Sequence, residues 1–329
     1  MLLVDEVNLY SVVFVVVLLV TRSLVQPTVF VAALYLFLAL LQLPRVPVGQ
    51  AQRVLHPTKV SVVAHRGGGH DAPENTIAAI RQAGKNGATG VELDVEFSAD
   101  GVPILMHDKT VDRTTDGSGP LSQMRFSELR QLDAVAKHRL RDKFVGERIP
   151  TLEEAVEECI RLRLTIYFDV KGQPDQAIAA FRELYRKHPV LYNSSIICSF
   201  EPKLLYWMRQ SDPHVVTALI HRPWSLSQCV DVAHYFDSLW KYRWMTLVMD
   251  VVLDCAPQSV VWRLCGISAF LIHKDFVSLN FVQHWAERGV EVVVWTVNTN
   301  VEKSFYQEVL QVNYITDSLV EDCSPTECS

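Results

Sequence analysis

Short β-rich runs alternate with runs of helical periodicity along most of this 329-residue chain. Such alternation is typical of βα units, in which crossover helices join parallel strands. Eight units predict a closed (β/α)8 barrel, a TIM-type fold that carries its functional side chains at the C-terminal ends of the strands. The expected strands are residues 60–65, 90–95, 165–170, 195–200, 215–220, 266–272, 291–296 and 313–316.

These strands define one α/β domain with additions at both ends. The barrel is expected over residues 60–320, a tail over 321–329, and a linker over the proline-containing stretch 44–59. A further β-run at 102–106 follows the second strand too closely for a crossover helix. We therefore expect it to return as a hairpin and to belong to an insertion at about 97–150.

The N-terminus is strongly apolar. Two apolar runs, 7–20 and 24–43, are separated by the polar residues 21–23, and a helix of about 20 apolar residues can cross a bilayer. A cleaved signal peptide is a poorer interpretation, because acidic residues replace the usual basic segment and no small-residue cleavage site follows. We expect a membrane anchor over residues 1–43, as one span or as a helical hairpin.

A third apolar stretch covers residues 244–271. It contains Asp250, Asp254 and Arg263, and each of these is costly at bilayer depth. A span here would also separate two strands that are expected to be neighbours. We interpret the stretch as a buried or membrane-grazing helix.

Ionisable side chains gather where three of the expected strands end: His65, Arg66, Glu92, Asp94, Asp169 and Lys171. Glu92 and Asp94 are two residues apart in an extended segment, so both project from one face into the barrel. Buried carboxylates need a cation, and a divalent metal with Asp169 as third ligand meets that need. Oxygen ligands favour Mg²⁺, with Ca²⁺ as the alternative. Charge balance by Arg66 and Lys171 alone is the other interpretation.

Two histidines are candidates for proton transfer. His65 ends the first strand and His107 follows the hairpin run, and imidazole is the side chain whose ordinary pKa lies near neutral pH. Arg66 and Lys171 can balance the negative charge that develops on a reacting phosphate.

Three further residues have weaker signals. Trp295 ends the seventh expected strand, where its ring either stacks on a substrate or fills the barrel. Glu74 is expected to pair with Arg66, and Asn75 to cap the helix that follows.

The ordered motifs resemble those of the glycerophosphodiester phosphodiesterase family. The likeness covers about residues 60–317 and includes His65-Arg66-Gly67, Pro73-Glu74-Asn75-Thr76, Glu92-Leu93-Asp94, Met106-His107-Asp108, Asp112-Arg113-Thr114-Thr115-Asp116-Gly117 and Phe168-Asp169-Val170-Lys171. The resemblance implies a TIM-type barrel, a divalent metal at Glu92, Asp94 and Asp169, and His65 with His107 as the acid–base pair. Many relatives have glutamate as third ligand, so the shorter Asp169 shifts the metal distance.

The resemblance also implies the substrates. These are glycerophosphodiesters such as glycerophosphoinositol, glycerophosphocholine and lyso-type glycerophospholipids, cleaved to glycerol 3-phosphate or lysophosphatidate and an alcohol. Attack by water and attack by the substrate's own hydroxyl, which gives a cyclic phosphate as in a lyase-type phospholipase, both remain open. A non-catalytic membrane adaptor would have lost site residues, and none is lost. The net charge of −6 argues against a nucleic-acid partner.

Two signals concern membrane topology. Asn193 begins an Asn-Ser-Ser triplet that fits N-glycosylation, which favours a lumenal or extracellular barrel at an endomembrane or the plasma membrane. Arg45, Arg53 and Lys59 follow the second apolar run and favour a cytosolic barrel. The signals conflict, and the lumenal or extracellular placement is the expectation to be tested.

Overall fold

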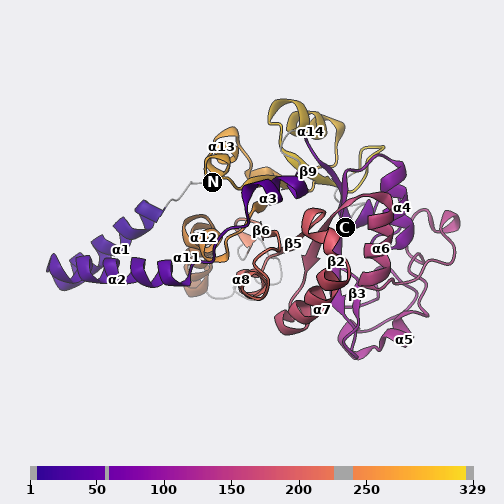
Figure 1. Cartoon of the computed structure of the whole chain (residues 1–329), viewed down its shortest axis with the longest axis horizontal. Helices are drawn as coiled ribbons and strands as arrows, with labels where there is room; N and C mark the ends of the chain where they lie inside the picture. Colours follow the sequence, from indigo (N-terminus) through magenta and orange to yellow (C-terminus); the bar gives the residue numbers. More distant parts are fainter. Residues whose placement is uncertain (1–5, 56–58, 226–239, 324–329) are drawn as a thin grey trace. The chain divides into compact units, whose positions relative to one another are not determined.

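The computed structural model describes residues 6–55, 59–225 and 240–323 (Figure 1). The chain divides into two compact units. The barrel unit contains Val46–Ile220 and Ser268–Ser329, and the helical unit contains Met1–Arg45 and His221–Ile267.

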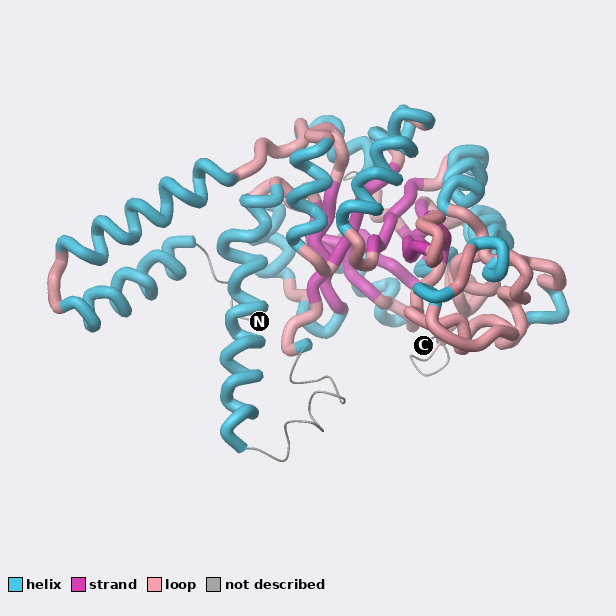
Figure 2. Tube along the Cα trace, turned by 90° about the horizontal axis from the view of Figure 1, so that it is seen from below, coloured by secondary structure: helices cyan, strands magenta, loops and turns pink. Residues whose placement is uncertain are grey.

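Within the described residues of the barrel unit, eight parallel strands close into a barrel. They are β1 (Val62–Ala64), β2 (Gly90–Phe97), β4 (Thr165–Val170), β5 (Ser195–Ser199), β6 (Thr217–His221), β7 (Ala269–His273), β8 (Glu291–Trp295) and β9 (Asn313–Thr316). Because β1 pairs with both β2 and β9, the sheet has no open edge there. Figure 2 shows these strands gathered together with helices around them. The predicted (β/α)8 barrel is confirmed.

Helices follow the strands as βα units require. They are α4 (Ile77–Lys85), α6 (Leu152–Leu162), α7 (Pro174–Lys187), α8 (Pro202–Ser211), α13 (Leu279–Glu287) and α14 (Asn300–Ser304, continued by the π-helical turn η7, Phe305–Val309). Local sequence fixes their starts. Thr151 accepts a hydrogen bond from the backbone N–H of Glu154, while the Glu154 carboxylate accepts one from Thr151. This capping box satisfies backbone donors at the start of α6.

The insertion between β2 and α6 begins with the expected hairpin. β3 (Pro103–Leu105) pairs antiparallel with β2, and the backbone N–H of Met106 donates to the carbonyl oxygen of Asp94 at 3.1 Å. The remainder contains η2 (Leu121–Gln123), α5 (Phe126–Leu129) and η3 (Arg141–Lys143). It has a small apolar core of its own, which includes Ile104, Val111 and Leu129. The hairpin returns His107 to the end of β2.

A short helix closes the N-terminal end of the barrel. α3 (Val48–Leu55) places Val54 and Leu55 in the apolar cluster inside the strands, and both are fully buried. Its Gln50 side chain donates to carbonyl oxygens ahead of β5 and β6, and Asn313 Nδ2 donates to the carbonyl of Leu55. The prediction of a linker over residues 44–59 is therefore wrong for residues 48–55. These residues form α3, and the last turn of α3 is part of the barrel core.

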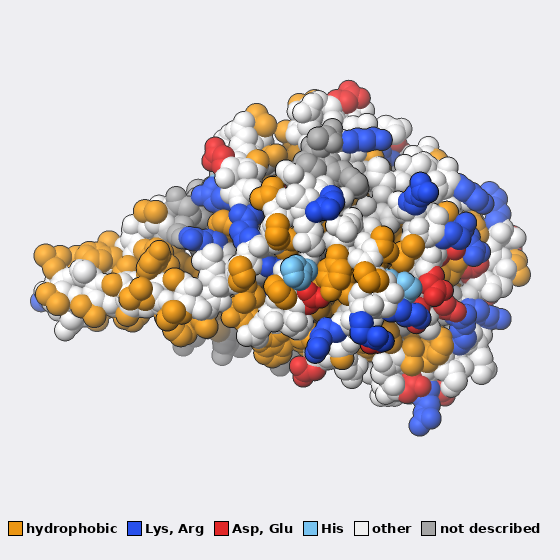
Figure 3. Space-filling view, in the orientation of Figure 1, with side chains coloured by type: hydrophobic (Ala, Val, Ile, Leu, Met, Phe, Trp, Pro, Cys, Tyr) orange, Lys and Arg blue, Asp and Glu red, His pale blue; other side chains and the backbone are white. Residues whose placement is uncertain are grey.

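The helical unit begins with two apolar helices. α1 (Glu6–Thr21) and α2 (Val25–Leu41) contact each other as an antiparallel hairpin (Figure 1). Many of their apolar side chains are more than half exposed, for example those of Val12, Leu19, Phe30 and Leu36. Figure 3 shows hydrophobic side chains over most of the visible surface of this hairpin.

The other long helical segment described in this unit lies between residues 240 and 265. α11 (Trp240–Ala256) continues through the π-helical turn η5 (Pro257–Val261) into α12 (Trp262–Cys265). Met245–Cys265 is long and apolar enough to cross a membrane, judged by length and composition alone. Leu247, Val248 and Val252 are 43–57% exposed. Of the two expected alternatives, a helix buried in the protein is therefore wrong for the outer face of α11, and a membrane-grazing helix stays a prediction.

Candidate active site

Three carboxylates meet near the C-terminal ends of β2 and β4. Asp94 and Asp169 are register partners on these neighbouring strands, and Glu92 precedes Asp94 by two residues on the same face. One oxygen of each side chain lies within 4.8 Å of the others. All three residues are buried. The structure thus brings together the three residues that were predicted as metal ligands.

The negative charges strongly perturb one another. Burial and the neighbouring Asp94 raise the pKa of Glu92 to about 8. Burial raises the pKa of Asp169 to about 6, against the opposing effect of Lys171. At Asp94 the effect of burial is outweighed by Lys171 and Arg66, which hold its pKa well below its usual range. The raised pKa values of Glu92 and Asp169 indicate that Arg66 and Lys171 do not fully balance the three negative charges.

One carboxylate oxygen of the cluster is suited to binding a cation. Asp169 Oδ1 is buried and has no hydrogen-bond partner among the described residues, whereas its Oδ2 lies 3.1 Å from Lys171 Nζ. A buried polar atom without a partner is rare, because its desolvation is not compensated. Three carboxylates are the oxygen donors that hard divalent ions bind. The residues therefore fit a divalent metal.

Two cationic residues lie against the carboxylates. Lys171 Nζ is 3.0 Å from Asp94 Oδ1, and Arg66 Nε is 3.5 Å from Asp94 Oδ2. The backbone N–H of Arg66 also donates to Glu92 Oε2 at 2.8 Å. These positions place both cations where they can contact an anion bound at the cluster.

His65 lies between two carboxylates. Its Nδ1 is 2.5 Å from Asp317 Oδ1, and its Nε2 is 3.8 Å from Glu92 Oε2. Asn298 Nδ2 donates to the second oxygen of Asp317 at 2.6 Å. Burial lowers the pKa of His65, but Asp317 outweighs this effect and the pKa is raised. Asp317 was not predicted as a site residue, although it follows β9, at the barrel end where such residues are expected.

Replacing Asp317 by asparagine is expected to lower kcat by about 10- to 100-fold, because His65 loses the carboxylate that fixes its ring and tautomer. Asparagine also removes the charge that raises the pKa of His65. The limb of the pH–rate profile that reports His65 should therefore move to lower pH, whether His65 acts as acid or as base. Reduced activity with an unchanged profile would contradict a direct influence on His65.

His107 has a corresponding arrangement. Its Nδ1 is 2.6 Å from Asp108 Oδ1, and Arg113 Nε donates to Asp108 Oδ2 at 2.6 Å. Burial lowers the pKa of His107, and Arg66 and Lys171 add to this effect. The partners Asp108 and Arg113 were not predicted. Asp108 directly follows His107 in sequence, which is the signal that could have identified it.

Glu74 and Asn75, in the loop after β1, form hydrogen bonds with residues of the site. Glu74 accepts hydrogen bonds from Arg66 Nη1 at 3.1 Å and from both terminal nitrogens of Arg113, so its expected pairing with Arg66 is confirmed. The prediction that Asn75 caps a helix is wrong. Thr76 caps α4, while Asn75 donates to Asp94 Oδ2 at 2.7 Å and accepts from the Asp94 backbone N–H at 3.1 Å. Asn75 therefore holds a predicted metal ligand.

The opposite side of the barrel end is aromatic. Trp295 makes edge-to-face contacts with Phe200 and His273, with ring centroids 6.0 and 5.1 Å apart. Trp295 also packs against the apolar cluster inside the barrel, and Phe200 is 49% exposed.

On β2, Glu96 shares the face of Glu92 and Asp94, and burial raises its pKa to about 7. Neither Phe200 nor Glu96 was predicted.

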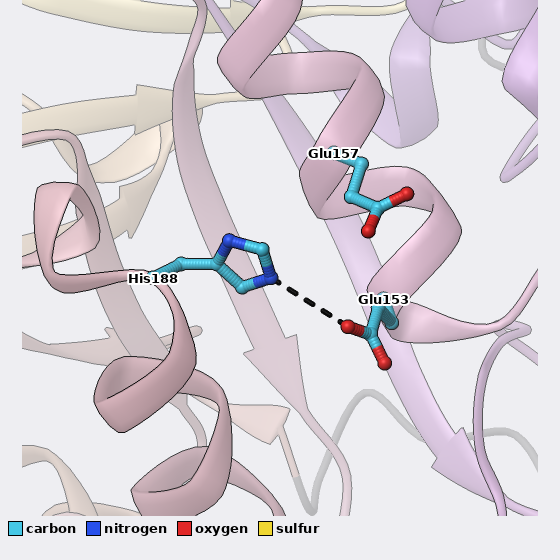
Figure 4. A group of neighbouring side chains, drawn as sticks. All are labelled: Glu153, Glu157 and His188. Atoms are coloured by element: carbon cyan, nitrogen blue, oxygen red, sulfur yellow. Dashed lines mark ion pairs between the residues drawn. The ribbon is translucent and has the colours of Figure 1, made fainter.

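A second group of metal-type side chains lies on the helices. Figure 4 shows Glu153 and Glu157 on α6 facing His188, which follows α7. His188 Nε2 is 3.6 Å from Glu153 Oε1, and Lys187 pairs with the same carboxylate. Both glutamates are partly or fully exposed, and Lys187 already compensates Glu153. This group is a surface ion-pair cluster that shares no residue with the carboxylate cluster at the strand ends.

Comparisons with known proteins agree with this geometry. The model of the glycerophosphoryl diester phosphodiesterase family matches residues 65–321. Glycerophosphodiester phosphodiesterase 1 of Bos taurus is 54% identical over 317 residues, and that of Homo sapiens is 52% identical over 317 residues. Each alignment covers 96% of both chains. A phosphodiesterase of Oleispira antarctica, solved with the product sn-glycerol-3-phosphate, is similar with a TM-score of 0.61 and 26% identity, over 80% of this chain and 95% of its own.

Proposed function

Because the chain belongs to the glycerophosphoryl diester phosphodiesterase family, we propose that its barrel uses one divalent cation, Mg²⁺ in preference to Ca²⁺, to hydrolyse its diesters. The substrates we propose are glycerophosphoinositol and related diesters, together with lyso-type glycerophospholipids. The products are glycerol 3-phosphate or lysophosphatidate and an alcohol. The observation that carries the proposal is the convergence of Glu92, Asp94 and Asp169 within 4.8 Å.

The charged residues are assigned to phosphate binding. Glu92, Asp94 and Asp169 would hold the cation, which polarises a phosphate oxygen and offsets the charge on the phosphoryl group. Lys171 and Arg66 lie against the same carboxylates. They would contact the remaining phosphate oxygens and offset the charge that grows as a fifth bond forms at phosphorus.

The histidines are assigned to proton transfer. A carboxylate fixes Nδ1 of each ring, Asp317 for His65 and Asp108 for His107, which leaves each Nε2 for the reaction. One ring would take a proton from the nucleophile, and the other would give a proton to the departing alkoxide. Trp295, with the half-exposed Phe200 beside it, would contact the organic part of the alcohol.

Turnover of glycerophosphoinositol by the full-length protein in detergent tests the proposal. We expect Mg²⁺ to support release of inositol and glycerol 3-phosphate, EDTA to abolish it, and added Mg²⁺ to restore it. Phosphorus NMR of the products distinguishes the routes, because a cyclic phosphate that accumulates would indicate the lyase-type reaction. Absence of turnover of any glycerophosphodiester with Mg²⁺ would contradict the proposal.

We also propose that the N-terminal hairpin anchors the enzyme in a membrane, with the barrel on the lumenal or extracellular side. α1 has 16 residues and α2 has 17, so each is about 24 to 26 Å long. Each is therefore shorter than a hydrocarbon core of about 30 Å. An antiparallel pair of such helices returns the chain to the side from which it entered. Asn193, at the end of η4 (Pro189–Asn193), is exposed, as a glycan acceptor must be.

Expression of the full chain in mammalian cells tests both statements. We expect the protein to resist extraction from membranes by alkaline carbonate. We also expect a glycosidase to increase its mobility, and Asn193→Gln to abolish that shift. A membrane-bound protein with no glycosidase-sensitive shift at Asn193 would contradict the lumenal or extracellular placement, and full extraction by carbonate would contradict the anchor.

A further inference from the structure

A pocket of about 210 Å³ lies between the loop after β1 and the insertion. The loop contributes Gly69, Pro73 and Glu74, and the insertion contributes Arg113, Lys137 and Arg139. Glu74 joins the pocket to the active site, because its carboxylate also accepts a hydrogen bond from Arg66. The chain of contacts therefore runs from the pocket through Glu74 to Arg66, and the backbone N–H of Arg66 donates to Glu92.

The charges on the pocket wall are predominantly positive. Arg113, Lys137 and Arg139 face one carboxylate, that of Glu74. Two guanidinium groups, those of Arg66 and Arg113, already compensate this carboxylate. Outside the pocket lining, Asp108 pairs with Arg113 and Glu321 pairs with Arg139. Among residues 59–225 and 240–323, Lys137 is therefore the lining cation whose charge no carboxylate compensates, and an anion in the pocket meets that charge.

Two histidines line the pocket, His70 and His138, and both ring nitrogens of His138 are held by hydrogen bonds to the backbone. His138 Nε2 donates to the carbonyl oxygen of Gly69 at 3.0 Å, and its Nδ1 accepts from the Leu140 backbone N–H at 3.1 Å. Burial lowers the pKa of His138, in agreement with this tautomer. The ring therefore shapes the pocket and holds the insertion against the β1 loop.

The arginines are held in place and the lysine is available. Arg139 Nε donates to the carbonyl oxygen of His70 at 3.0 Å, and Arg139 also pairs with Glu321. Arg113 is fixed by Glu74 and Asp108. Lys137 is exposed, and within the described segments 59–225 and 240–323 no carboxylate forms an ion pair with it. Lys137 is thus a cation at the rim with free donors.

We propose that this pocket binds a second phosphate group, a monoester or inorganic phosphate dianion, while the phosphodiester occupies the carboxylate cluster. Fixed guanidinium groups and one mobile ammonium group are the donors that recognise such a dianion. The dianion is either carried by the alcohol part of the substrate or free in solution. This inference rests on the proposed function, and it defines a preferred class of substrate, namely glycerophosphodiesters with a phosphorylated alcohol.

Kinetics with two substrates test the inference. We compare kcat/KM for glycerophosphoinositol 4-phosphate and for glycerophosphoinositol at low salt, with Mg²⁺ and the full-length protein. The phosphorylated substrate should be preferred about fivefold or more, and Lys137→Glu should abolish this preference. Lys137→Arg, which keeps the charge, should retain it. The matched control is Lys143→Glu, an exposed lysine of η3 in the same insertion, which should change the preference less than twofold.

A second measurement identifies the source of the dianion. Inorganic phosphate is titrated into the wild-type protein and the two glutamate variants, and both thermal unfolding and turnover of glycerophosphoinositol are recorded. Stabilisation and altered turnover that Lys137→Glu abolishes and Lys143→Glu retains would identify free phosphate. A preference for the phosphorylated substrate without these effects would identify the substrate's own group.

Equal effects of Lys137→Glu and Lys143→Glu in both measurements would overturn the inference. Failure of the proposed function is a different result, because the wild-type protein would then hydrolyse neither diester. In that case the unfolding measurement with phosphate still reports on the pocket.

Discussion

Replacing Glu92 by glutamine is expected to reduce kcat/KM for glycerophosphoinositol by about a thousandfold or more, because one negative ligand of the cation is lost while the side chain keeps its size. Glu92 shares the site with Asp94 and Asp169, so the affinity for Mg²⁺ should fall in parallel. Isothermal calorimetry with Mg²⁺ measures that affinity without reference to turnover. Circular dichroism establishes that the variant is folded.

The surface cluster offers a matched control for this change. Glu153→Gln makes the same replacement in the other group of metal-type side chains (Figure 4), and it should leave both turnover and Mg²⁺ affinity near the wild-type values. If Glu153→Gln removed Mg²⁺ binding while Glu92→Gln did not, the assignment of the metal to the strand ends would be wrong.

Removing either histidine ring is expected to have the next largest effect. His65→Ala and His107→Ala should each lower kcat by about 10²- to 10⁴-fold, the usual contribution of a positioned acid or base. Mg²⁺ affinity should change far less than in Glu92→Gln, since neither ring belongs to the proposed ligand set, although His65 Nε2 lies 3.8 Å from Glu92 Oε2. This separation between kcat and metal affinity distinguishes the histidine variants from Glu92→Gln.

A substrate with a better leaving group assigns the two roles. When the alcohol is 4-nitrophenol, the leaving group departs without a proton. The variant that lacks the general acid should then recover most of its activity, and the variant that lacks the base should not. Equal recovery of both variants, or of neither, would contradict the division of roles between His65 and His107.

Much of the barrel could be predicted because its strands are buried on both faces. Parallel strands of this kind are near-continuous apolar runs, and the expected strands at 165–170 and 313–316 coincide with β4 and β9. Once the strands were located, the barrel rule for strand ends placed Glu92, Asp94 and Asp169 close together.

The partners of the site residues could not be predicted in the same way. Asp317 lies 252 residues from His65, so only the closure of β9 against β1 brings them together. Asn75 was expected to cap a helix, which is the common role of asparagine before a helix. Its backbone adopts a positive φ of 56°, and its side chain contacts Asp94 instead.

The helix α3 was missed for a different reason. It has eight residues, too few for a periodic pattern to be distinguished from a polar linker. Its residues become buried only when the strands have closed into the barrel whose N-terminal end α3 covers. The same condition applies to the contacts of Gln50, which reach carbonyl groups more than 140 residues away.

The position of α3 restricts how the enzyme could be released from the proposed N-terminal anchor. Val46, Val54 and Leu55 belong to the barrel core, although they follow the helical hairpin almost directly in sequence. A protease that cuts ahead of Val46 would separate the hairpin from a barrel whose N-terminal end is still closed by α3. A cut beyond Leu55 would remove α3 together with the hairpin, and water would then reach the apolar interior of the barrel. Shedding with retained activity is therefore confined to a segment of a few residues after α2.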